Sequence, residues 1–179
     1  YIEDVDSDGD LDVLSASYFD HRVLWYENIN DEIFTEHEIS NNAVDAWSVY
    51  AIDMDNDNDI DVLSASNQDN KIAWYENDGE QQFSEHVITT NAITAWSVFA
   101  IDMDNDNDID VLSASSGDNK IAWYENNGSQ GFTEFVISTN AYYAHSIYAI
   151  DIDNDNDIDV LSASTSDNKI SLYENNGNE

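Results

Sequence analysis

One segment recurs along the chain and indicates its architecture: Asp53-Met54-Asp55-Asn56-Asp57-Asn58-Asp59-Ile60-Asp61-Val62-Leu63-Ser64-Ala65-Ser66. Nearly the same letters begin again at Asp102 and Asp151, and a looser copy begins at Asp4, so the starts lie 49 residues apart. Self-similarity at a fixed period is the signature of a repeat architecture. We predict a single repeat domain over 1–179, with repeats at approximately 1–42 (partial), 43–91, 92–140 and 141–179 (partial).

Each repeat contains four strand signals separated by turns. In the second repeat these signals cover residues 47–52, 61–66, 71–76 and 83–89, and no segment shows a helical period. Four short strands in a repeat of about 40–50 residues are typical of a β-propeller blade. A β-solenoid is the alternative, but its repeats are usually shorter. We therefore expect an all-β fold of four-stranded antiparallel propeller blades, forming part of a larger propeller.

The charge balance excludes several classes of protein. The 179 residues carry 39 acidic and 4 basic side chains, a formal net charge of −35. Four cations cannot form the basic face that a nucleic-acid binder needs, and they disfavour docking to an anionic membrane. No apolar run is long enough to insert into a bilayer. Hydrophobic residues make up 41%, too many for a disordered acidic tail, so a compact body must hold this charge and divalent cations are expected to neutralise it.

The acidic run of each repeat has the ligand spacing of a calcium loop. Aspartates stand at every second position, and Ca²⁺ takes about six to eight oxygen ligands. An EF-hand uses side chains at positions 1, 3, 5 and 9, a carbonyl at 7 and a sharp turn at 6. The turn position holds Gly9, Asn58, Asn107 and Asn156, the residue types that most readily become left-handed. The closing glutamate of an EF-hand is absent, since Ser64 stands there in the second repeat.

We expect about one Ca²⁺ per repeat, four in total. The predicted metal ligands are Asp4, Asp6, Asp8, Asp10, Asp12, Asp53, Asp55, Asp57, Asp59, Asp61, Asp102, Asp104, Asp106, Asp108, Asp110, Asp151, Asp153, Asp155, Asp157 and Asp159. Asp10, Asp59, Asp108 and Asp157 hold position 7 and are expected to bind through their carbonyls.

The repeated motif resembles the FG-GAP/VCBS-type repeats of integrin α-subunit propellers and of many bacterial and algal surface proteins. The resemblance implies a calcium loop between the first and second strands of each blade. It also implies side-chain ligands at positions 1, 3, 5 and 9 of each loop, for example Asp53, Asp55, Asp57 and Asp61. The Phe-Gly and Gly-Ala-Pro signatures are missing, which places the chain nearer the VCBS-like branch.

Three further repeat positions carry side chains of chemical interest. The basic residues all share one repeat position, two residues after an aspartate: Arg22, Lys71, Lys120 and Lys169. We interpret them as partners in local ion pairs. The alternative is a ring of cations that binds an acidic sugar. A second position is interpreted as core: Trp25, Trp74, Trp123 and Leu172. A third is interpreted as packing between blades, with ligand stacking as the alternative: Trp47, Trp96 and His145.

The repetition also bears on function, because an active site is one constellation of distinct residues and every polar cluster here occurs four times. We therefore do not expect an enzyme. We expect a calcium-binding scaffold or adhesion module that is extracellular or on the cell surface and has a protein or glycan partner. A carbohydrate-binding lectin module and an accessory region of a polysaccharide-active enzyme are the alternatives. The fourth repeat stops after its third strand, so we also expect self-association or a longer parent chain.

Overall fold

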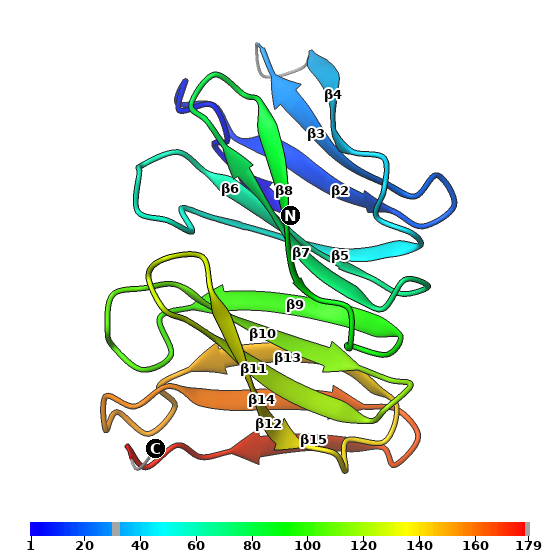
Figure 1. Ribbon diagram of the computed structural model, residues 1–179, viewed down its shortest axis with the longest axis vertical. Coiled ribbons are helices and arrows are strands. Elements are labelled where there is room, and N and C mark those ends of the chain that lie inside the picture. The colour runs from blue at the N-terminus through cyan, green and yellow to red at the C-terminus, as the bar shows by residue number, and fades with distance from the viewer. Residues whose placement is uncertain (30–32, 178–179) are drawn as a thin grey trace.

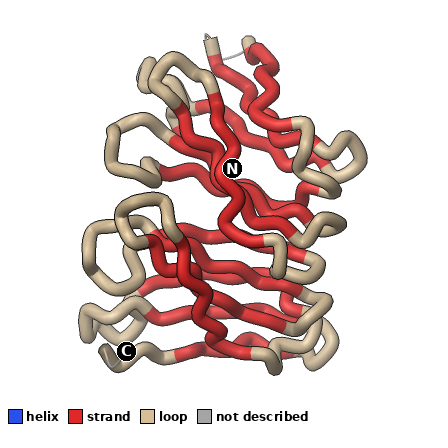
Figure 2. Tube along the Cα trace, viewed as in Figure 1, coloured by secondary structure: helices blue, strands red, loops and turns tan. Residues whose placement is uncertain are grey.

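The computed structural model describes residues 1–29 and 33–177, and the regular elements in this part of the chain are all strands (Figure 2). They form four antiparallel sheets in which the strands follow chain order. The sheets contain β1 (Ile2–Glu3), β2 (Asp12–Ser17), β3 (Arg22–Asn28) and β4 (Phe34–Ser40); β5 (Ala46–Ile52), β6 (Asp61–Ser66), β7 (Lys71–Asn77) and β8 (Phe83–Thr89); β9 (Ala95–Ile101), β10 (Asp110–Ser115), β11 (Lys120–Asn126) and β12 (Phe132–Ser138); and β13 (Ala144–Ile150), β14 (Asp159–Ser164) and β15 (Lys169–Tyr173).

The predicted all-β fold of propeller-type repeats is confirmed. In the second repeat the strands begin and end within one residue of the expected ranges. No helix in the described residues is long and apolar enough to cross a membrane. The fourth sheet has three strands, so the outer edge of β15 has no strand partner in the described part of the chain.

The four sheets stack along the long axis of the molecule in chain order (Figure 1). Three core clusters hold the stack together, and each joins one sheet to the next. We call the side of a sheet that packs on the following sheet its forward face, and the opposite side its backward face. Between the second and third sheets, Met54, Ile72 and Trp74 come from a forward face, and Ala100 and Val111 come from a backward face.

The first strands of the sheets lie side by side and share a ladder of aromatic rings. Tyr1, Tyr50, Phe99 and Tyr148 occupy one repeat position, and consecutive ring centroids are 4.8, 4.9 and 4.9 Å apart. Hydrogen bonds accompany the ladder; for example, the backbone N–H of Val98 donates to Ser48 Oγ at 3.4 Å. Identical contacts thus recur from sheet to sheet, which is how repeat proteins build one continuous core.

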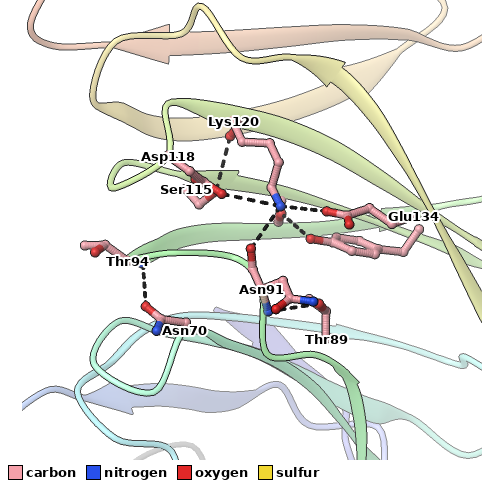
Figure 3. Close-up of polar contacts among 10 residues, drawn as sticks. Asn70, Thr89, Asn91, Thr94, Ser115, Asp118, Lys120 and Glu134 are labelled. Carbon is pink, nitrogen blue, oxygen red and sulfur yellow. Dashed lines mark hydrogen bonds and ion pairs between the residues drawn. The ribbon is translucent and has the colours of Figure 1, made fainter.

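In the second and third sheets, one lysine ties the sheet to the loop that leads into it. Lys120 Nζ donates to the carbonyl of Asn91 at 2.9 Å and to Glu134 Oε1 at 2.6 Å, and it pairs with Asp118 at 3.4 Å (Figure 3). Lys71 makes the equivalent three contacts in the second sheet. The predicted local ion pair is confirmed, but the shorter contact goes to a glutamate on the neighbouring fourth strand. Lys169 pairs with Asp167 at 3.1 Å and remains 59% exposed.

Candidate metal centre

The four acidic loops join the first and second strands of each sheet. They lie along one edge of the stack, on the left in Figure 1, as the loops before β6, β10 and β14 show clearly. The arrangement follows from the repeat, because identical hairpins in stacked sheets place identical loops at the same edge. Neighbouring loops also touch: Asn56 Nδ2 donates to the carbonyl of Asn107 at 3.1 Å, and Asn105 Nδ2 donates to that of Asn156 at 3.2 Å.

Each loop brings three carboxylates together. One oxygen from each lies within 4.8 Å of the other two, in the groups Asp4, Asp6 and Asp8; Asp53, Asp55 and Asp57; Asp102, Asp104 and Asp110; and Asp151, Asp153 and Asp159. These groups draw on positions 1, 3, 5 and 9 of the predicted ligand pattern. The triads could therefore hold one metal ion in each repeat.

The backbone of the loop wraps around its first aspartate. In the second repeat, the N–H groups of Asp57 and Asn58 donate to the two oxygens of Asp53, each at 3.0 Å. Asn58 has φ of 77°, so the predicted turn residue is left-handed. Asn56, at position 4, is also left-handed with φ of 63°, a second turn that was not predicted from the sequence. Two left-handed residues fold the loop tightly enough to point alternate carboxylates inward.

The aspartate at position 9 is a buried anchor for the loop. Asp61 is fully buried; its Oδ2 accepts the N–H of Met54 at 2.8 Å, and its Oδ1 accepts that of Asn77 at 2.8 Å. The same two bonds recur on Asp12, Asp110 and Asp159. Burial raises the pKa of Asp61 to about 7 and that of Asp110 to about 6, and the N–H donors oppose the rise. The anchor fastens the start of the loop to the end of the third strand.

The position-3 carboxylate of the second repeat has an oxygen that no hydrogen bond within the described part of the chain satisfies. Asp55 Oδ1 is buried and has no hydrogen-bond partner among the described residues. Burial, together with the neighbouring charge of Asp57, raises the pKa of Asp55. A cation beside this oxygen would supply the missing partner and favour the ionised form. Because all donors in the triads are carboxylate oxygens, the site suits a hard cation such as Ca²⁺.

The side chain at position 7 lies outside the four triads. Asp108 instead rests against Gly128 in the turn after β11, where a Cβ would come 2.4 Å from Asp108 Oδ2. Asp59 lies in the same way against Gly79, and Asp157 against Gly177. These glycines have positive φ, so the turn conformation and the close approach both require them. Binding of a cation through the position-7 carbonyls, Asp10 included, stays a prediction.

Two of the repeated aromatic positions form stacks. Trp25 and Trp74 are buried as predicted, and they stack on His37 and His86 with centroids 4.5 and 4.7 Å apart. The core interpretation is wrong for Leu172, which is 47% exposed because no further sheet in the described part of the chain covers it. At the other position, Trp96 lies between Trp47 and His145, with centroids 4.0 and 4.1 Å apart, which confirms packing between blades. Trp47 nevertheless stays 43% exposed.

Comparisons with known proteins agree with this architecture. A lectin from Agrocybe aegerita, described as recognising non-reducing terminal N-acetylglucosamine, superposes on 99% of this chain with a TM-score of 0.63 and 13% sequence identity. This chain spans about half the length of that lectin, 50% by alignment. No curated protein sequence matches the chain significantly. The model described as FG-GAP-like repeat matches residues 4–64, 53–113 and 102–162, and the chain therefore belongs to the FG-GAP-like repeat family.

Proposed function

We propose that the chain is a calcium-stabilised β-propeller module that acts outside the cell as a scaffold or adhesion surface. The observation that carries this proposal is the fourfold gathering of three carboxylate oxygens within 4.8 Å. Like charges so close together destabilise the loop unless a cation lies among them. Extracellular modules with such loops often bind Ca²⁺ at about 10⁻⁴–10⁻³ M, a concentration that the cytosol does not reach.

A role without catalysis fits the repetition of the site. Each of the four loops gathers three carboxylates drawn from positions 1, 3, 5 and 9, which suits four similar ions better than one reaction centre. In this proposal the ions stiffen the edge of the stack, and the remaining surface is free to contact a protein or glycan at the cell surface.

Calcium titration of matched variants tests the proposal. Asp104→Ala removes a carboxylate of the third triad, whereas Asp108→Ala removes a side chain outside the triads that rests on Gly128. We expect calorimetry to show about four sites in the unmodified protein and in Asp108→Ala, and one fewer in Asp104→Ala. When the free calcium concentration is 100 times the dissociation constant of a site, binding at that site stabilises the fold by about 2.7 kcal/mol. Equal melting temperatures in calcium and in chelator would contradict the proposal.

A carbohydrate-binding role is the second candidate, because an exposed aromatic patch lies at the opposite ends of the strands from the acidic loops. A pocket of about 500 Å³ there is lined by Tyr18, Phe19, Trp47, Asn67 and Trp96. Aromatic faces beside an amide are suited to stacking on a sugar ring and bonding to its hydroxyls. The similar fold of a lectin is consistent with this role. A glycan array that includes terminal N-acetylglucosamine tests it, with Trp47→Ala as the matched variant.

A further inference from the structure

The two end sheets of the stack each have one face of the kind that forms the three internal interfaces. One is a forward face and the other is a backward face. Each internal interface joins a forward face to a backward face. The first sheet uses its forward face on the second, and the fourth sheet uses its backward face on the third. None of the three clusters joins the first sheet to the fourth, and these sheets lie at opposite ends of the long axis (Figure 1).

The forward face of the fourth sheet is apolar and uncovered. Ile170 is 76% exposed, whereas Ile72 and Ile121, which hold the same repeat position, are fully buried. Ile152 is 47% exposed, although its counterpart Met54 is buried between two sheets. These side chains have the size and polarity of interface residues, and no sheet among the described residues covers them.

The backward face of the first sheet is its uncovered complement. Val13 is 36% exposed, whereas its counterparts Val62 and Val111 are fully buried in internal interfaces. Ile2 is 60% exposed at the position that Ala51 fills in the second sheet. Exposed apolar patches of this kind mark interaction sites, and here the internal interfaces identify the surface that fits them.

The aromatic ladder ends in the same two places. Its rungs are evenly spaced at 4.8–4.9 Å, and its terminal rings, Tyr1 and Tyr148, are both about half exposed. A fourth sheet placed against the first sheet of another copy would bring Tyr148 beside that copy's Tyr1 and continue the ladder.

We propose that two copies of this chain associate head to tail and close into one ring. The forward face of each fourth sheet packs on the backward face of the other copy's first sheet, so the same contact forms twice around a two-fold axis. Such closed symmetry satisfies both ends, whereas a contact that did not close would extend into a filament. The lectin that superposes on this chain is about twice its length, which is the combined length of two copies.

Solution mass in the presence of calcium tests the proposal. We expect residues 1–179 to have twice the monomer mass of 20.2 kDa by light scattering. Ile170→Asn on the forward face and Ile2→Asn on the backward face should each shift the protein to monomer. Phe19→Asn, which alters an 88% exposed ring on the turn between β2 and β3, is the matched control and should leave the dimer intact.

Mixing the two interface variants provides a second readout that misfolding would not reproduce. A mixed dimer of Ile170→Asn and Ile2→Asn has one unaltered contact, whereas either variant alone has none. We therefore expect the mixture to dimerise at a concentration where each variant alone is monomeric. Any of four results would overturn the closed two-copy ring. The unmodified protein could be monomeric, or it could form a series of oligomers larger than a dimer. Ile170→Asn and Phe19→Asn could have the same mass, or the mixture of interface variants could stay monomeric.

Discussion

Replacing Asp110 by alanine in the absence of calcium tests the buried anchor of the metal loop. Its two oxygens accept the N–H groups of Met103 at 3.0 Å and Asn126 at 2.7 Å, and the side chain is fully buried. Alanine leaves both donors without a partner, at a cost of about 1–3 kcal/mol each, or about 2–6 kcal/mol together. Burial raises the pKa of Asp110 to about 6, so keeping this carboxylate ionised at pH 7 costs free energy in the folded protein. That cost offsets part of the stabilisation from the two hydrogen bonds. We expect a net loss of about 2–4 kcal/mol.

Denaturant unfolding in excess chelator measures this loss without any contribution from bound metal. Asp108→Ala is the matched control, because it removes a neighbouring carboxylate outside the triads and should cost less than about 1 kcal/mol. A repeat protein can lose cooperativity when one unit is weakened, so the m-value has to be compared as well as the midpoint. Equal losses in the two variants would show that the anchor bonds contribute nothing special to the loop.

Three further predictions concern pH, the buried lysines and the core. The pKa of Asp61 is raised from 3.8 to about 7, so its stabilising contribution is complete below about pH 4 and is lost as pH rises through 7. The calcium-free protein should therefore melt at a higher temperature at pH 5 than at pH 8. The same difference in melting temperature in Asp61→Asn would contradict this. Lys120→Met leaves Glu134 and the Asn91 carbonyl without their lysine partner and should lower the free energy of unfolding by about 1–3 kcal/mol. Lys169→Met should lower it by less than about 0.5 kcal/mol, and similar denaturation midpoints of the two variants would refute the difference. Trp74→Ala should cost about 3–5 kcal/mol, against less than about 1 for Leu172→Ala, and thermal melts showing similar losses would mean that Trp74 does not support the core.

The repeat made most of the fold predictable from the sequence. Each strand pattern appears several times, so chance alternation in one copy is corrected by the others, and the strands of the second repeat lie where they were expected. The shape of the acidic loop was predictable for the same reason, since the spacing of the aspartates and the turn residues are local properties. Asn58 shows this directly, because its left-handed φ of 77° follows from residue type and position.

Features that depend on neighbours distant in sequence were not predictable. Lys71 was expected to pair with Asp69, but its shorter contact is with Glu85, 14 residues away on the next strand. The burial of Asp61 depends in the same way on Asn77, at the far end of β7. These contacts are set by strand register and sheet stacking, which a sequence pattern specifies only after the fold is known.

The metal loop and the core share residues, so proposed calcium binding and sheet stacking are linked. Met54 lies between the predicted ligands Asp53 and Asp55, its N–H donates to Asp61, and its side chain packs in the cluster that joins the second sheet to the third. Stacking therefore holds the ligands in place, and by reciprocity an ion that fixes the ligands strengthens the stacking. The fourth loop lacks this support, because Ile152 is exposed where Met54 is buried. A second copy packed on that face would give the fourth site the environment of the others, so assembly of the proposed ring and calcium binding at the fourth loop should reinforce each other.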